Sequence, residues 1–145
     1  MLGAATVPER VQGLLLIAPA CLPLQKPLRG SAADLAKQLA SRTYPFRDIV
    51  ATAQEIVAAP RGAARLVRAL RRLDLSAQME RVRAAGIPTL VVACTTDTLV
   101  TPQHCRSAAR LLAASYEEIA LPGGHIWMLR QPFELGKLLR NSRWG

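Results

Sequence analysis

The sequence is poor in aromatic and acidic side chains. Only 4% of its 145 residues are aromatic, and 10 Asp and Glu residues stand against 19 Lys and Arg residues, which gives a formal net charge of +9. Such a surplus of positive charge is compatible with nucleic acid, anionic lipid or acidic substrates. The few aromatic residues are not interleaved with the basic ones, whereas grooves for single-stranded nucleic acid need aromatic stacking platforms. We therefore expect no nucleic-acid partner.

Long apolar runs are also missing. The run at residues 14–18 is far shorter than the roughly 20 residues that a membrane-spanning helix requires. Residues 1–7 contain neither a basic start nor a long apolar stretch, so we expect no secretory signal. Half of the residues are nevertheless hydrophobic. This excludes a disordered chain and leaves a globular chain of about one domain.

Cysteine is scarce as well. The sequence contains three cysteines, Cys21, Cys94 and Cys105, and none of them forms a Cys-x-x-Cys pair. An odd number of cysteines without a secretory signal favours free thiols in a reducing compartment, so we expect a cytoplasmic protein. We expect Cys94 to be buried as a small apolar side chain.

Three short apolar runs predict the strands of a sheet. Residues 11–20 contain a stretch that is closed by Pro19, and every position is apolar from Leu14 on, as in a strand buried on both faces. Residues 89–94 predict a second buried strand that is rich in β-branched side chains. Residues 116–121 predict a third, shorter strand. Strands of this kind belong to parallel sheets that are covered by helices.

Helical segments alternate with these strands. Thr101 and Pro102 are typical of an N-cap and a first helical residue, and Gly86 is typical of the position just after a helix. Pro60 is expected to end a helix, because proline breaks a helix interior. Helices are predicted at residues 31–40, 46–58, 63–73, 76–85, 102–114 and 132–139. The alternation of strands and helices predicts an α/β architecture.

Two side chains that can take part in acid–base chemistry follow neighbouring predicted strands. Asp97 comes after the strand at residues 89–94, and His125 comes after the strand at residues 116–121. Open α/β sheets perform their chemistry just beyond the carboxyl ends of the strands. The separation of 125 − 97 = 28 positions is one strand–helix–strand unit, so the two loops should be adjacent. A buried carboxylate that holds Nδ1–H leaves Nε2 of the imidazole free as a general base.

Three segments resemble a known family. Residues 87–102, residues 121–125 (Leu-Pro-Gly-Gly-His) and residues 130–132 (Arg-Gln-Pro) resemble the C-terminal half of an α/β-hydrolase-fold enzyme. In that family the acid of the catalytic triad follows the seventh strand and the histidine follows the eighth, in the chain order nucleophile, acid, histidine. The resemblance implies that Asp97 is the triad acid and His125 the triad base.

The resemblance also implies a domain organisation. Residues 1–145 would form a single truncated α/β-hydrolase-like domain with a partial parallel sheet of three strands. Its core strand would lie within residues 1–20, a helical lid would occupy residues 21–85, and the core with the Asp and His loops would occupy residues 86–145.

One family feature is absent from the sequence. The nucleophile of the family lies in a Gly-x-Ser-x-Gly elbow, and none of the six serines, nor any of the three cysteines, has glycines at that spacing. The segment that supplies the oxyanion hole is also missing, and residues 1–8 resemble the end of the helix that follows the elbow. The sequence thus resembles a hydrolase without its first half, and we expect it to be inactive alone.

The activity implied by the resemblance is esterase- or lipase-like hydrolysis of a small ester or acyl substrate. A serine from the absent half would attack the carbonyl, and no metal and no organic cofactor is implied. The nucleophile itself stays open: an Asp or Cys in its place would change the substrates to epoxides, halides or lactones. The oligomeric state is not determined by the sequence.

A second interpretation treats the chain as a non-catalytic interaction module. In the helix predicted at residues 63–73, Leu66, Leu70 and Leu73 share one face, and arginines lie opposite. A basic amphipathic helix of this kind can bind acidic partners or the surface of an anionic membrane. An ordinary helix with its arginines in water is the simpler alternative.

Other candidate residues are weaker. Asp48 and Asp74 do not follow predicted strands and are therefore poor candidates for a triad acid. His104 falls in the first turn of a predicted helix, which favours a surface or capping role. Trp127 and Met128 directly follow the histidine of the predicted site and are expected to pack, with an acyl-pocket wall as the alternative.

Overall fold

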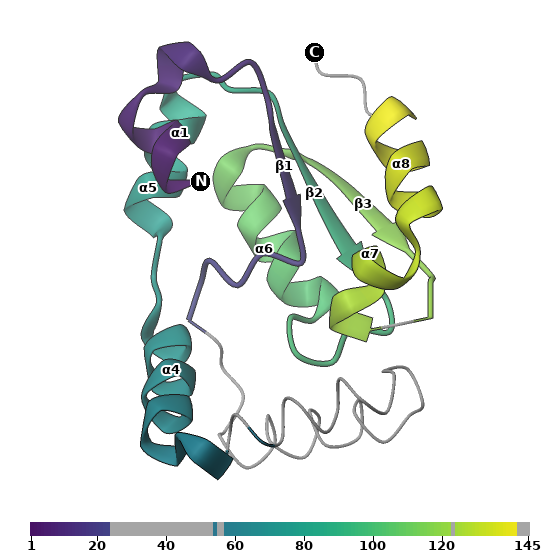
Figure 1. Ribbon diagram of the computed structural model, residues 1–145. Coiled ribbons are helices and arrows are strands. Elements are labelled where there is room, and N and C mark those ends of the chain that lie inside the picture. Colours follow the sequence, from purple (N-terminus) through teal and green to yellow (C-terminus); the bar gives the residue numbers. More distant parts are fainter. Residues whose placement is uncertain (24–53, 55–56, 123, 142–145) are drawn as a thin grey trace.

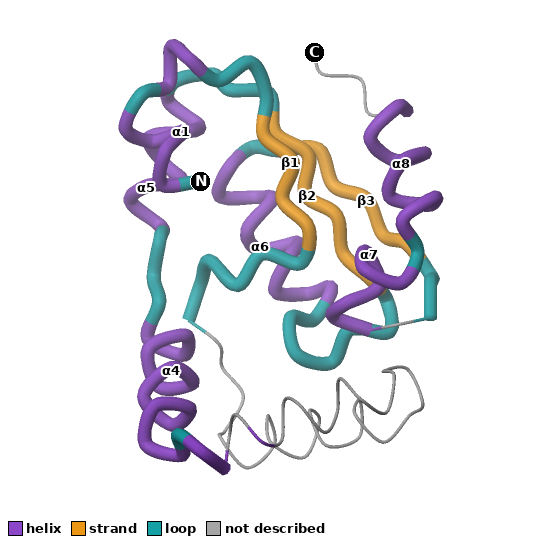
Figure 2. Tube along the Cα trace, in the orientation of Figure 1, coloured by secondary structure: helices purple, strands orange, loops and turns teal. Residues whose placement is uncertain are grey.

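A sheet of three parallel strands forms the centre of the molecule. The computed structural model describes residues 1–23, 54, 57–122 and 124–141. Within them, β1 (Leu14–Ile17), β2 (Thr89–Cys94) and β3 (Ser115–Ile119) lie in the order β1-β2-β3. Helices lie on both sides of this sheet (Figure 1), and the strands stand out between them in Figure 2. The parallel sheet with its helical layers confirms the predicted α/β class.

The register of the sheet brings the carboxyl ends of its strands to one edge. Leu14 pairs with Thr89 on β2, and Cys94 at the end of β2 pairs with Ile119 at the end of β3. The bounds of β2 coincide with the predicted strand at residues 89–94. The expectation that the first strand is buried on both faces is wrong: all four residues of β1 are only partly buried. Within the described residues, β1 pairs with β2 alone and is therefore an edge strand.

All six residues of β2 are buried, and the five from Leu90 to Cys94 alternate between two hydrophobic layers. Val91 and Ala93 belong to one layer, together with side chains of α1 (Leu2–Thr6), α5 (Ser76–Ala84) and α6 (Pro102–Leu112). The other layer lies on the opposite face and contains Leu90, Val92, Cys94 and Trp127. Successive side chains of a strand point to opposite faces, so an all-apolar sequence serves two layers at once.

The second layer is covered by the C-terminal helices. Trp127 begins α7 (Trp127–Arg130), and Leu135 and Leu138 of α8 (Pro132–Asn141) pack against the same cluster. The short helix α7 was not predicted, because a four-residue helix carries no periodic pattern. A 3-10 turn, η1 (Pro8–Arg10), leads from α1 towards β1.

The three helix boundaries that Pro60, Gly86 and Thr101 are predicted to mark lie within the described residues. Gly86 follows α5 with a φ of +65°, and Thr101 caps α6, both as predicted. The helix before Pro60 ends at Ala58, as predicted, and Pro60 itself begins α4 (Pro60–Arg72), where a first-turn proline leaves no unmet hydrogen bond. The predicted helix at residues 31–40 and most of the one at residues 46–58 lie outside the described residues, so the predicted lid is not confirmed. In the part of the chain that the structure describes, no helix is long and apolar enough to cross a bilayer.

Candidate active site

The carboxylate of Asp97 is fixed by the loop that follows β2. The backbone N–H of Asp97 donates to the carbonyl of Cys94, 3.0 Å away, which makes a tight turn at the end of the strand. Oδ1 of Asp97 then accepts hydrogen bonds from the backbone N–H groups of Leu99 and Val100, at 2.8 and 2.9 Å. The side chain is fully buried. A buried carboxylate held in this way has one oxygen left for a specific partner.

That partner is His125. Nδ1 of His125 lies 2.8 Å from Oδ2 of Asp97. An ionised carboxylate only accepts hydrogen bonds, so Nδ1 must carry the proton and donate it. Nε2 has no hydrogen-bond partner within the described residues, and 35% of the side chain is exposed. The pair therefore joins a buried, oriented carboxylate to an imidazole that reaches solvent.

The loop after β3 brings His125 to this position. Gly124 has a φ of +54°, a left-handed conformation that glycine adopts without a steric penalty. It begins the 3-10 turn η2 (Gly124–Ile126), which holds the histidine. Gly123, the other glycine of the Leu-Pro-Gly-Gly-His segment, lies outside the described residues. The short turn places the imidazole directly beyond the carboxyl end of the sheet, beside the loop of Asp97.

Thr96 and Cys94 tie the two loops together. Oγ1 of Thr96 donates to the backbone carbonyl of Leu121 across 2.8 Å, and Sγ of Cys94 lies 3.3 Å from the same oxygen. The N–H of Thr95 donates to the carbonyl of Ile119 at 2.9 Å, which continues the β2–β3 ladder by one step. Sequence reasoning did not single out Thr96. The only signal was a small hydroxyl residue directly before the acid.

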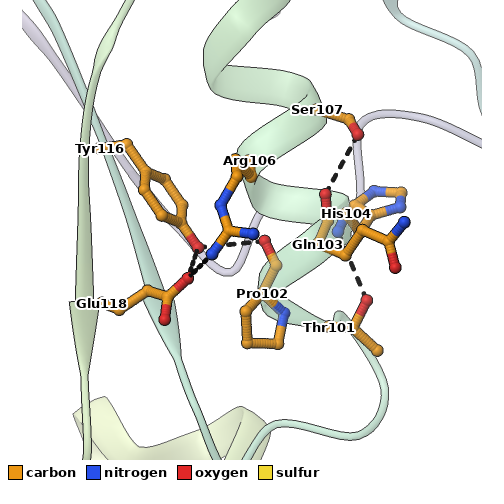
Figure 3. A network of polar contacts seen from close by, with 8 residues as sticks. All are labelled: Thr101, Pro102, Gln103, His104, Arg106, Ser107, Tyr116 and Glu118. Atoms are coloured by element: carbon orange, nitrogen blue, oxygen red, sulfur yellow. Dashed lines mark hydrogen bonds and ion pairs between the residues drawn. The ribbon is translucent and has the colours of Figure 1, made fainter.

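A second polar network joins α6 to β3 (Figure 3). The hydroxyl of Tyr116 lies 2.6 Å from Oε1 of Glu118 and 3.1 Å from the carbonyl of Pro102. Arg106 forms an ion pair with Glu118, and its guanidinium lies over the Tyr116 ring, 5.4 Å from the centroid. Burial and the hydrogen bond to Glu118 raise the pKa of Tyr116, so its hydroxyl stays protonated. Because Pro102 follows the acid loop closely, this network also anchors that loop.

His104 differs from the surface residue that the sequence predicts. Its backbone N–H does meet the capping hydroxyl of Thr101, at 3.4 Å. Its ring is partly buried, however, and Nε2 is buried without a hydrogen-bond partner in the described structure. Burial lowers the pKa of this histidine, opposed by a hydrogen bond to the backbone of Pro19. The neutral imidazole is therefore the favoured form at this position.

The three cysteines are free and buried, as predicted for Cys94. Burial, reinforced by the nearby charge of Asp97, raises the pKa of Cys105 to about 12. Burial also raises the pKa of Cys21. The thiols of Cys21 and Cys105 are accordingly protonated at neutral pH and poor nucleophiles. Among the described residues, no group of three or more His, Cys, Asp or Glu side chains is arranged to hold a metal ion.

A cavity of about 370 Å³ lies away from the Asp97–His125 pair, and neither residue lines it. It opens between β3 and α8, with Trp127 and Leu121 among its lining residues. Trp127 is fully buried, and its Nε1 has no hydrogen-bond partner within the described residues. Met128 packs against the same layer. Both residues therefore pack in the hydrophobic layer, as the sequence predicts.

Comparison with known proteins identifies the fold. No family model and no curated protein sequence matches the chain. Among solved structures, an α/β hydrolase from the metagenome of Mar Chica lagoon sediments in Morocco shares 21% identity over 96% of this chain, with a TM-score of 0.51. BpoC from Mycobacterium tuberculosis H37Rv, described as a non-heme bromoperoxidase, shares 17% identity over 94% with a TM-score of 0.55. A thermophilic esterase from Thermogutta terrifontis shares 19% identity over 94% with a TM-score of 0.51.

The parallel sheet, the two helical layers and these matches define the class: the chain has the α/β-hydrolase fold. The likeness covers nearly all of this chain but only 52%, 59% and 57% of the three solved proteins. The chain therefore spans a little over half the length of the proteins that it resembles.

Proposed function

We propose that Asp97 and His125 are the acid and the base of an acyl-hydrolase triad that acts on a small ester or related acyl substrate. The observation that carries this proposal is the 2.8 Å contact between Oδ2 of Asp97 and Nδ1 of His125. A carboxylate already fixed by two backbone N–H groups is suited to hold an imidazole in one tautomer and one orientation. The α/β-hydrolase fold and an esterase among the structural matches support this reaction class.

In the proposed reaction, a nucleophile attacks the carbonyl carbon of the substrate. Nε2 of His125 accepts the proton of the nucleophile and later returns it to the leaving group. Asp97 stays ionised throughout and stabilises the imidazolium that forms. The exposure of the imidazole supports this role, as does Nε2, which accepts no hydrogen bond from the described residues, because both leave the base accessible to the proton that it must remove.

We assign the nucleophile to no residue of this sequence. None of its six serines lies in a Gly-x-Ser-x-Gly elbow, and a base with its orienting acid does not achieve acyl transfer without a nucleophile and oxyanion donors. We infer that these 145 residues alone do not hydrolyse esters. In the complete enzyme, as we propose it, a serine supplied from outside these residues completes the triad.

The coding DNA upstream of Met1 provides the test. We expect an in-frame segment that encodes Gly-x-Ser-x-Gly, and we expect the longer protein to hydrolyse p-nitrophenyl esters. His125→Ala and Asp97→Asn should each lower its kcat by about 10⁴-fold. His104→Gln is the matched control, since His104 and His125 are the only two histidines of the sequence, and it should keep activity within about tenfold.

Three results would overturn the proposal. The first is ester hydrolysis by the longer protein that survives His125→Ala. The second is turnover by the 145-residue chain itself that is lost in His125→Ala, which would place the nucleophile within the chain. The third is an in-frame stop codon upstream, which would leave the Asp–His pair without a nucleophile and favour the non-catalytic interaction module.

A further inference from the structure

Helix α4 carries a straight stripe of arginines. Arg61, Arg65, Arg68 and Arg72 are spaced by four, three and four residues, and all four are exposed. At 3.6 residues per turn they lie within an arc of about 60° on one side of the helix, and the stripe is about 16 Å long at a rise of 1.5 Å per residue. This face of the helix therefore presents four guanidinium groups in one direction.

The stripe has no counter-charge in the described structure. α4 contains no acidic residue, and none of the four arginines forms an ion pair with a described carboxylate. Asp74, the described acid closest in sequence, follows the helix and uses Oδ1 to accept hydrogen bonds from Ser76. Four like charges on one helix face repel one another, and an anionic partner would relieve this repulsion.

The helix is also separated from the sheet and from the other described helices. Every described side chain of α4 is exposed, and the helix makes no extensive contact with any described strand or helix. Figure 1 shows α4 below the start of α5 and away from the sheet. A helix placed in this way can approach a large surface without disturbing the candidate active site.

We propose that the arginine stripe of α4 docks the protein on an anionic phospholipid bilayer. Guanidinium groups bind phosphate with paired hydrogen bonds, and each Lys or Arg near an anionic leaflet contributes an attraction worth about fivefold in affinity. A straight, exposed stripe fits a plane of headgroups. The inference is independent of the hydrolase chemistry proposed above.

Two other partners fit the same surface less well. Single-stranded nucleic acid needs aromatic side chains on which bases stack, and α4 has none. A protein interface needs a buried aromatic or large apolar anchor, and the arginine stripe itself offers none. A bilayer surface requires neither bases to stack nor a pocket to fill.

Sedimentation with lipid vesicles tests the proposal on the full chain. We expect binding to vesicles rich in phosphatidylserine, no binding to vesicles of phosphatidylcholine alone, and weakening as salt is raised from low to physiological ionic strength. The variant with Arg61, Arg65, Arg68 and Arg72 all changed to Gln should bind at least about 100-fold more weakly. Glutamine is a good helix former, so circular dichroism of this variant should match the wild type.

The matched control removes the same charge from other places. Arg10, Arg81, Arg83 and Arg110 are exposed and lie outside α4, and changing all four to Gln should weaken vesicle binding by less than about tenfold. Equal losses in the two variants would show that net charge alone attracts the protein and would overturn the docking surface. Equal binding to uncharged vesicles, or tighter binding to an oligonucleotide or polyglutamate at the same salt, would overturn it as well.

Discussion

Thr96 donates a hydrogen bond from its side-chain hydroxyl to the backbone carbonyl of Leu121, across 2.8 Å. The bond joins the residue just before Asp97 to the loop that leads to His125. The two side chains of the candidate site come from separate loops, so their distance depends on how firmly the loops are joined. Thr96 is thus a positioning residue for the pair, and its hydroxyl bonds to Leu121 rather than to either side chain of the pair.

Replacing Thr96 with valine should loosen this connection. We expect Thr96→Val to lower the free energy of unfolding by about 1 kcal/mol, because the carbonyl of Leu121 keeps only its weaker contact with the thiol of Cys94. Urea denaturation measures this loss, and the imidazole resonances of His125 should broaden. Thr95→Val is the control, since Thr95 donates its hydrogen bond to Ile119 from the backbone N–H. An equal effect of the two substitutions would contradict the role assigned to Thr96.

Replacing Asp97 with asparagine should change the tautomer of His125. The Oδ1 of asparagine can still accept from Leu99 and Val100, but an amide N–H facing Nδ1 forces the imidazole to carry its proton on Nε2. Nitrogen NMR of the ring detects this change, and we expect a loss of about 1–3 kcal/mol in stability. Asp74→Asn, which alters an exposed acid, should change neither the tautomer of His125 nor the stability. A His125 ring that keeps its Nδ1–H in Asp97→Asn would refute the prediction.

Removing the hydroxyl of Tyr116 should weaken the network between α6 and β3. We expect Tyr116→Phe to lower stability by about 1 kcal/mol, because the ring stays under Arg106 while the bonds to Glu118 and Pro102 are lost. A double-mutant cycle with Glu118→Gln should give a favourable coupling energy of about 0.5 kcal/mol or more. Additive effects of the two substitutions would show that the hydroxyl and the carboxylate act independently.

His104 should make the fold sensitive to acid. Burial lowers the pKa of this histidine in the folded chain, so its neutral form contributes full stability above the unfolded value of about 6.5. That contribution is lost as the pH falls from about 6.5 through the lowered pKa of the folded state. His104→Leu should therefore flatten the dependence of unfolding free energy on pH in this range. Parallel curves for wild type and variant would contradict the assignment.

Cys105 should make the stability of the fold sensitive to alkaline pH. Its pKa is raised to about 12 in the folded chain, so its contribution is complete below the unfolded value of about 8.5 and is lost as the pH rises towards 12. Cys105→Ala should reduce the alkaline loss of stability. In the native chain at pH 8, iodoacetamide should label this thiol far more slowly than in urea. Rapid native labelling of Cys105 would show that its thiol is neither buried nor protonated.

The strands and the geometry of the candidate site were predictable from sequence for physical reasons. The short run at residues 89–94 is rich in β-branched side chains and follows a proline, which favours a buried strand over a helix, and its observed bounds are the predicted ones. Asp97 and His125 follow consecutive parallel strands, so the topology alone brings their loops together. Their catalytic role, in contrast, stays a proposal, because no geometry of two residues identifies a substrate.

Other features depend on contacts that no local pattern encodes. The partial exposure of β1 follows from its edge position, not from its sequence of three leucines and an isoleucine. The hydrogen bond from Thr96 to Leu121 depends on the register between two segments that are distant in the sequence. The burial of His104 arises where α6 meets the segment after β1, at Pro19. Each of these depends on tertiary contacts, which periodicity and capping signals do not report.

The burial of β2 on both faces determines how the chain can open. Neither hydrophobic layer can detach without uncovering this strand, since Val91 and Ala93 belong to one layer and Leu90 and Val92 to the other. Partial unfolding of either layer is therefore costly, and the two layers should melt as a single cooperative unit. In native-state hydrogen exchange, the amides of β2 should be the slowest in the molecule, with exchange governed by global unfolding.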